Sequence, residues 1–196
     1  PVFGGRYLDN FTGSWAIPVR HQLNRLILPA GREITYKNHG EPQLQLTRVN
    51  TGTGTEYVWA ARDLKPVALD ADTPAWFPVF GFVEVTEFPT WASVAEWARP
   101  LYENTSAQTP ALKAKAEELA RGQLTIERKV LAVLDFVQRE VRYLGMELGP
   151  GSHRPNLPAT VLAQRFGDCK DKARLFCALL DYLGIEASPA LVHSER

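Results

Sequence analysis

The sequence predicts an α+β protein, with an antiparallel β-rich, sandwich-like part followed by a helical part. Apolar and polar residues alternate in several short segments before residue 88, a pattern typical of half-buried strands. From residue 89 onward, apolar residues instead recur at helical spacing, which is typical of helices packed against a core. We therefore expect three segments: a β-rich accessory domain in residues 1–88, a helical connector in 89–123 and the start of a second core in 124–196.

The strands of the β-rich domain are expected in residues 17–29, 42–50, 55–63 and 81–88. The letters TGTG at residues 51–54 predict a hairpin with a four-residue loop between the second and third strands. Residues 65–81 contain three prolines and are expected to form an irregular connection. We expect earlier strands to be missing from the start. The five tryptophans, Trp15, Trp59, Trp76, Trp91 and Trp97, are interpreted as core and interdomain packing residues, with a stacking surface for a sugar or peptide as the alternative.

The helical part begins with two expected helices, in residues 89–104, with Thr90 as N-cap, and in residues 109–122. The strongest periodicity lies in residues 125–143, where six apolar residues form one stripe: Ile126, Val130, Val133, Leu134, Val137 and Val141. A short helix is predicted over 157–167 and a longer one over 168–182, with Gly184 as its stop. Residues 185–193 then predict a strand that enters the core.

Composition excludes several functional classes. Lysine plus arginine equals aspartate plus glutamate, so the net charge is zero and no nucleic-acid partner is expected. No apolar run approaches the ~20 residues of a membrane span. The two cysteines, eight residues apart on one predicted helix, would lie ~12 Å apart, too far for a disulfide. They have no histidines at metal-ligand spacing, so we expect neither a metal nor another cofactor. Oligomeric state has no signature in the sequence.

Cys169 is the candidate nucleophile. Asp168 is a favourable N-cap, which places Cys169 in the first turn of the predicted helix. Thiols in that position are commonly ionised more easily, because the helix N-terminus stabilises an anion. Its backbone N–H would also face the oxygen of a tetrahedral intermediate. Lys170 and Lys172 would add positive charge if their ammonium groups came near.

An ordinary packing role for Cys169 stays open at this point, because free cysteines are often buried. Cys177 is interpreted as a core residue. Asp171 and Lys172 are read as surface charges of the first turn. Tyr143 and His153, near Cys169 in the chain, are candidate binding residues, although a packed tyrosine and a solvated or capping histidine are the simpler interpretation of both.

The segment GDCKDKARLFCALLDYLGIEASPALV, residues 167–192, resembles the nucleophile segment of the bacterial transglutaminase-like superfamily. The preceding VRYLGMELGPGSHRPNLPATVLAQRF extends the similarity, which covers about residues 124–192. The earlier part resembles the uncharacterised β-rich domain often fused to such cores. The resemblance implies the first half of a papain-like fold, with a Cys–His–Asp triad in which Cys169 attacks a carboxamide of a protein or peptide.

The triad histidine and aspartate of the family have no counterpart in this chain. His193 lies on the first expected strand after the helix, where the family's histidine does not sit, and it remains a weak match for the base. His21 and His39 are read as surface histidines. We therefore expect a chain that ends inside the catalytic core, carries the nucleophile and is inactive alone.

The function predicted on this basis is a cysteine-dependent amide hydrolase or acyl transferase, such as a cysteine protease. The alternative is a non-catalytic binding or scaffolding protein that retains a degenerate core. The resemblance favours a bacterial protein in the periplasm or outside the cell, although the sequence itself does not determine the compartment.

Overall fold

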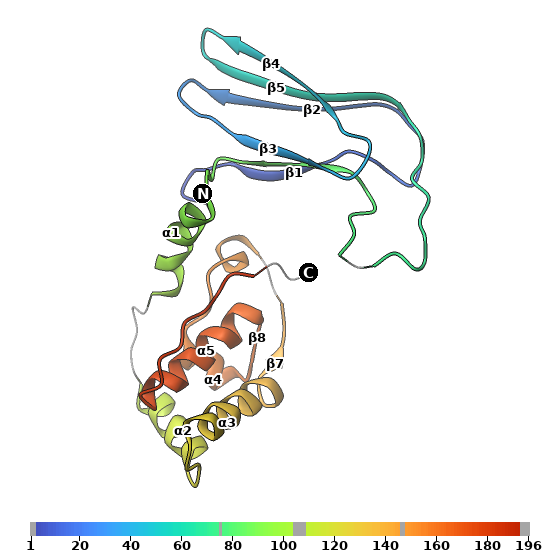
Figure 1. Ribbon diagram of the computed structural model, residues 1–196. Helices are drawn as coiled ribbons and strands as arrows, with labels where there is room; N and C mark the ends of the chain where they lie inside the picture. Colours follow the sequence, from blue (N-terminus) through green and yellow to red (C-terminus); the bar gives the residue numbers. More distant parts are fainter. Residues whose placement is uncertain (1–2, 75, 104–108, 146–147, 193–196) are drawn as a thin grey trace. The chain divides into compact units, whose positions relative to one another are not determined.

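The computed structural model describes residues 3–74, 76–103, 109–145 and 148–192. These residues form two compact units, 3–94 and 95–192, called here the β unit and the helical unit (Figure 1). The strands of the β unit are β1 (Leu8–Thr12), β2 (Val19–Pro29), β3 (Thr35–His39), β4 (Gln45–Thr51), β5 (Gly54–Leu64) and β6 (Phe82–Thr86). The helix α1 (Trp91–Tyr102) follows them. The antiparallel strands followed by helices confirm the predicted α+β class.

Two three-stranded antiparallel sheets make up the β unit, with strand orders β1-β6-β3 and β2-β5-β4. They share one core, built from Leu26, Leu28, Leu44, Tyr57, Trp59, Val83 and Val85. Trp59 of β5 is at its centre, with 0% of its surface exposed. Its ring lies 5.3 Å from that of Phe11 on β1 and 5.8 Å from that of Tyr36 on β3, centroid to centroid, so one indole joins both sheets.

Three expectations for the β unit were wrong in detail. The hairpin between β4 and β5 has a two-residue loop, because Thr51 pairs with Gly54 and extends the ladder into the predicted turn. The strands β1 and β3 were not predicted, because their side chains are mostly exposed and show no alternation; both are held by pairing with β6. Trp59 is a core residue, as predicted, whereas Trp15, Trp76 and Trp91 are exposed and do not pack in the core.

The helical unit contains α2 (Pro110–Ala120), α3 (Ile126–Arg139), α4 (Pro158–Gln164) and α5 (Cys169–Tyr182), with β7 (Arg142–Tyr143), β8 (Phe166–Gly167) and the 3-10 turn η1 (Gly149–Ser152). One buried cluster unites the four helices: Leu112, Ala116, Val133, Phe136, Val137, Val141, Val161, Leu162, Leu175, Leu179 and Leu180. Figure 1 shows α2 and α3 beside α5. The helix α2, placed in the connector by sequence, thus contributes to the same core as α3 and α5.

Side-chain caps fix where these helices begin. Thr109 accepts a hydrogen bond from Leu112 N before α2, and Thr125 accepts one from Arg128 N before α3. Thr90 accepts one from Ser93 N at the start of α1, as its predicted N-cap role requires. Gly122, with a φ of 76°, follows α2 in the left-handed region that favours glycine.

The predicted helix over 125–143 and the predicted strand over 185–193 needed correction. Helix α3 ends at Arg139, and residues 142–143 form β7, which pairs in parallel with β8 instead of continuing the helix. Ile126, at the start of the predicted stripe, is exposed. Residues 185–192 form no strand, since none of the described strands pairs with them; Ile185 and Ala187 instead pack against the helical core. His193 lies outside the described residues.

Candidate nucleophile site

A reciprocal cap fixes the start of α5. Asp168 accepts hydrogen bonds from the backbone N–H groups of Lys170 and Asp171, at 3.1 and 3.2 Å. In return, the Asp168 N–H donates to Asp171 Oδ2 at 3.1 Å, which completes a capping box. Cys169 is therefore held as the first residue of the helix, as the sequence predicted.

Gly167 is required by the close approach of the Asp171 side chain. A Cβ atom on residue 167 would lie 2.7 Å from Asp171 Cβ and 2.9 Å from Asp171 Oδ2. Separations that short are repulsive, so a larger residue would force the capping carboxylate out of place. The glycine of the Gly-Asp-Cys sequence thus makes room for the cap that positions the cysteine.

Charged side chains are buried around this helix start. Lys170 forms an ion pair with Asp168, and the two side chains have only 8% and 6% of their surface exposed. Burial opposes the charge on Lys170, but the hydrogen bond and charge of Asp168 outweigh it and raise the pKa of Lys170 above its ordinary value. Asp171 is also buried, so its interpretation as a surface charge was wrong.

Asp171 connects the helix start to the preceding loop. Its carboxylate accepts hydrogen bonds from the Asn156 backbone N–H at 2.6 Å and from Asn156 Nδ2 at 3.1 Å. Together with the bond from the Asp168 N–H, these donors occupy both carboxylate oxygens. The loop before α4 and the first turn of α5 are therefore fixed to each other by one side chain.

Lys172 bonds to the end of α3 and not to the residues around Cys169. Its ammonium donates to the backbone carbonyl of Val141 at 2.8 Å and to that of Gln138 at 3.4 Å, next to the end of α3. The Leu144 N–H donates to Gly167 O at 3.0 Å and extends the β7–β8 pairing. These contacts anchor the residues before Cys169 to the end of α3, whereas Lys170 is the lysine that adds charge near the cysteine.

Cys169 is exposed and Cys177 is partly buried. Burial raises the pKa of the Cys177 thiol, which disfavours its thiolate and makes it a poor nucleophile. As the first residue of α5, Cys169 has a backbone N–H that precedes the helix's own hydrogen-bond ladder and is suited to bind an anionic oxygen. An exposed thiol beside such a donor is an arrangement suited to acyl transfer.

Tyr102, at the end of α1, is a neighbour of the site that sequence reasoning missed. Burial raises the pKa of its phenol, the Lys170 ammonium opposes that effect, and Cys169, Asp168 and Asp171 raise the pKa further. Its phenol therefore lies within electrostatic range of the cysteine. No local motif marks Tyr102, because it is 67 positions from Cys169 in the chain and only the fold brings it near.

The other predicted site residues lie on different elements. His153, just after η1, packs its ring against Trp97 of α1 at 5.4 Å between centroids. Tyr143 ends β7 and is 58% exposed. His21 and His39 belong to the β unit, where His39 pairs with Glu84 at 2.9 Å. The described residues thus include Cys169, the candidate nucleophile and candidate oxyanion donor, and no assigned base.

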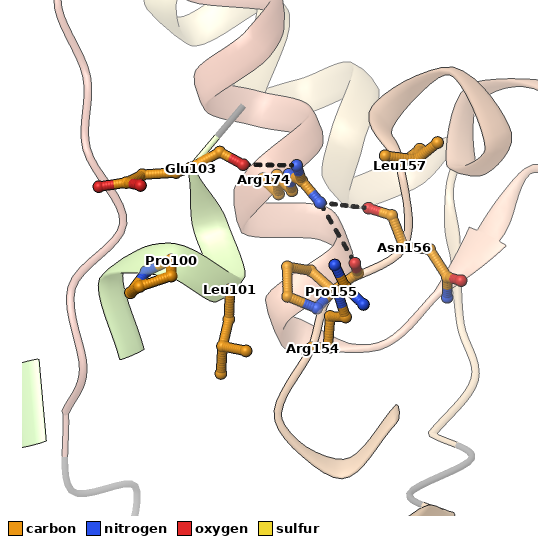
Figure 2. A pocket seen from close by; sticks show the side chains of 8 residues that line it. All are labelled: Pro100, Leu101, Glu103, Arg154, Pro155, Asn156, Leu157 and Arg174. Atoms are coloured by element: carbon orange, nitrogen blue, oxygen red, sulfur yellow. Dashed lines mark hydrogen bonds between the residues drawn. The ribbon is translucent and has the colours of Figure 1, made fainter. Parts of the chain in front are cut away.

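A pocket of about 350 Å³ lies in the helical unit (Figure 2). Its walls come from the end of α1, the loop before α4, and α5: Pro100, Leu101, Glu103, Arg154, Pro155, Asn156, Leu157 and Arg174. Cys169 is not one of the lining residues. Asn156 and Arg174 were not predicted as site residues, although Arg174 follows Lys170 by four positions and so shares its helix face.

Two kinds of feature do not occur in the described part of the chain. No cluster of three or more histidine, cysteine, aspartate or glutamate side chains in residues 3–192, gaps excepted, has the arrangement of a metal site. None of the helices described there combines the length and the apolar character that crossing a bilayer requires.

Comparison with known proteins gives two family matches. Residues 113–191 match the Transglutaminase-like superfamily, and residues 1–68 match DUF3857, a domain of unknown function with solved structures. No curated protein gives a match.

Two solved structures are similar. The "putative protease" from Parabacteroides distasonis aligns with a TM-score of 0.78 at 16% identity, covering 94% of this chain and 36% of that one. A "putative cysteine protease" from Cytophaga hutchinsonii aligns with a TM-score of 0.38 at 15% identity, covering 91% of this chain and 66% of that one.

The likeness to the Parabacteroides protein, at 16% identity, shows a shared fold, and this chain spans about a third of that protein's length. The DUF3857 match lies within the β-rich part of the chain, and the other match contains Cys169. Residues 113–191, which contain Cys169, are thus similar to the transglutaminase-like superfamily, and residues 1–68, which precede that segment, are similar to a DUF3857 domain.

Proposed function

We propose that the chain carries the nucleophile part of a cysteine-dependent amide hydrolase, with Cys169 attacking carboxamides of proteins or peptides. The observation that carries the proposal is the exposed thiol at the first residue of a helix whose start is fixed by buried, fully bonded groups. The match of residues 113–191 to the transglutaminase-like superfamily supports it.

The reaction begins with attack of the Cys169 thiolate on the carboxamide carbon, which forms a C–S bond and places negative charge on the carbonyl oxygen. The Cys169 backbone N–H stabilises that oxygen. The C–N bond then breaks, and the amine leaves with a proton from a general acid, for which a histidine is the expected group. Water attacks the resulting thioester, releases a carboxylic acid and restores the thiol. Attack by an amine in place of water would give acyl transfer.

The buried charges at the helix start would keep the nucleophile in one position. Asp168 and Asp171 cannot leave their places without breaking the hydrogen bonds that satisfy them, and a buried charge without partners is costly. Near-attack geometry needs such restraint, because a displacement of about 1 Å can cost on the order of 10² in rate.

Alkylation tests the assignment of the nucleophile. Iodoacetamide is added to the folded chain near pH 7, and the modification of each cysteine is followed by peptide mass spectrometry. We expect Cys169 to react well before Cys177, because it is exposed and the pKa of Cys177 is raised by burial. Cys169→Ser should remove the fast reaction, and Cys177→Ser, the matched control, should leave it unchanged.

Equal alkylation rates for the two cysteines would overturn the assignment. Turnover is tested separately, with peptide amides as substrates and release of the amine as readout. Because the described residues supply no assigned base, we expect the 196-residue chain to alkylate at Cys169 while hydrolysing amides negligibly. Efficient hydrolysis abolished by His193→Ala would identify His193 as the base and contradict this expectation.

A further inference from the structure

The pocket in Figure 2 contains a buried guanidinium without a carboxylate partner. Arg174 projects from α5 and is only 7% exposed. It donates to three backbone carbonyls: Pro155 O at 3.3 Å, Asn156 O at 3.5 Å and Glu103 O at 3.4 Å. Carbonyl oxygens carry partial charge only, so these bonds orient the guanidinium without neutralising it.

A second guanidinium, that of Arg154, lines the same pocket. Burial lowers the pKa of Arg174, and the positive charge of Arg154 lowers it further, whereas Asp171 and Tyr102 act in the opposite direction. Arg154 is exposed and forms no ion pair with any residue in the described part of the chain. Two like charges therefore face one cavity and repel each other.

The one acidic residue among the lining side chains is engaged elsewhere. The Glu103 carboxylate pairs with Arg99 Nε at 3.2 Å. In Figure 2 this carboxylate points away from Arg174, and the Glu103 backbone carbonyl faces the guanidinium instead. Asp171, the nearest buried acid on α5, is bonded to Asn156 and to the Asp168 N–H. The charge of the pocket is thus left for a ligand to balance.

We propose that this pocket binds a carboxylate of the peptide substrate, supplied by an acidic side chain or a free C-terminus, through Arg154 and Arg174. A guanidinium fork matches a planar carboxylate, and the volume is that of a pocket for a small ligand group. Arg174 follows Cys169 by five residues on α5, which places it about 7.5 Å further along the helix axis and about 140° around it, so a peptide that reaches both would span more than the two extended residues that equal the axial rise. The inference rests on the proposed function and specifies its substrate class.

Binding of matched peptides tests the inference. The full chain carrying Cys169→Ala, which cannot be acylated, is titrated calorimetrically with four short peptides. These contain glutamate or glutamine and end in a free carboxylate or an amide. We expect an acidic peptide to bind roughly five- to tenfold more tightly than its neutral partner at low salt. The pair that shows the difference identifies the side chain or the C-terminus as the source.

Two pocket variants, compared with one control variant, test whether the preference for acidic peptides arises from this pocket. Arg154→Gln removes an exposed charge, is expected to fold normally and should abolish the preference. Arg128→Gln, the matched control, removes an exposed arginine of α3 that does not line the pocket, and should retain it. Arg174→Gln should also lose the preference; because that side chain is buried, its folding is checked by circular dichroism.

The outcomes separate this inference from the proposed function. Equal affinity for acidic and neutral peptides, or a preference that survives Arg154→Gln, overturns the carboxylate site while selective alkylation of Cys169 stands. Tight acidic-peptide binding with no selective alkylation retains the site and overturns the proposed nucleophile. Inorganic phosphate that competes as well as the acidic peptide would show a general anion site and overturn the assignment to a peptide.

Discussion

The two units of this chain bury different kinds of side chain. In the β unit the core surrounds Trp59, and the buried polar residues there are Ser14 and Gln22, both uncharged. In the helical unit four buried charged residues, Asp168, Lys170, Asp171 and Arg174, occur within seven positions at the start of α5. Both units have an apolar core, but the charged residues that are buried in the described part of the chain all belong to the helical unit.

This difference indicates that the buried apolar residues of the β unit stabilise the fold, whereas the buried charges of the helical unit position the start of α5. Replacing buried ion pairs by apolar groups is often neutral or stabilising, so stability alone does not explain the charges around Cys169. Every one of them instead bonds to backbone or side chains that fix the helix start or the adjacent loop. We interpret the β unit as held by burial, and the first turn of α5 as held by directional bonds.

Removing Trp59 should give the largest loss of stability. We expect Trp59→Ala to lower the free energy of unfolding of the β unit by about 3–5 kcal/mol, because the indole fills the space between both sheets. Trp59→Phe should cost only about 1–2 kcal/mol, since the indole N–H has no hydrogen-bond partner among the described residues. Chemical denaturation followed by circular dichroism measures both, and equal losses would contradict the packing role.

Removing the Asp168 side chain should give the next largest loss of stability, and it should also change the alkylation rate of Cys169. Asp168→Ala removes the N-cap and leaves Lys170 without its partner, which we expect to cost about 2–3 kcal/mol. Asp168→Asn keeps a cap-forming oxygen and loses only the charge, so it should cost less. Both variants should change the alkylation rate of Cys169, and Trp59→Phe should not. An unchanged rate in Asp168→Ala would argue against positioning by the cap.

Gly167→Ala is expected to cost about 1–3 kcal/mol through overpacking against Asp171. The matched control is Gly52→Ala in the hairpin loop, where no atom lies within 4 Å of the added Cβ. Thermal unfolding compares the two. If both substitutions shift the midpoint equally, the contact with Asp171 does not constrain residue 167.

The smallest effects concern the pH dependence of stability, which has opposite directions at Glu87 of the β unit and Lys170 of the helical unit. The hydrogen bond from Arg32 lowers the pKa of Glu87 in the β unit, despite burial, so its contribution is present above pH 4.5 and is lost as the pH falls below that value. Lys170 has a raised pKa, so its contribution is present below pH 10.5 and is lost only at higher pH. The acid-side slope of stability against pH should become shallower in Arg32→Gln, while Glu56, Glu118 and Glu127, whose pKa values are also lowered, retain the rest of it. An acid-side slope unchanged by that substitution would contradict the assignment.

Local patterns in the sequence were sufficient to predict much of the fold. The stripe of α3, the caps Thr90 and Asp168, and the position of Cys169 at a helix start all depend on neighbours within a few residues. Strands β1 and β3 could not be predicted in that way, because they are exposed and depend on pairing with the distant β6. The early end of α3 likewise depends on β8, more than 20 residues later.

The buried charged residues at the start of α5 likewise include some features that the local sequence predicts and others that depend on distant segments. The capping box of Asp168 and Asp171 is a local motif that the sequence contains, although Asp171 was interpreted as a surface charge. Its burial depends on Asn156, and the pocket depends on α1 meeting the loop before α4. The pocket is lined by residues from three segments that are distant in the sequence, and no local sequence pattern predicts that these segments come together.

The single carboxylate shared by the loop and the helix start has a consequence for hydrogen exchange. The backbone N–H groups of Asn156 and Asp168, twelve positions apart, both donate to Asp171. Neither amide belongs to a helix or sheet ladder of its own, so each is protected from exchange with D₂O only while that carboxylate stays in place. One local opening, the departure of Asp171, would expose both amides together. The loop before α4 and the residue before Cys169 would then behave as one unit of local unfolding, although they belong to different segments of the fold.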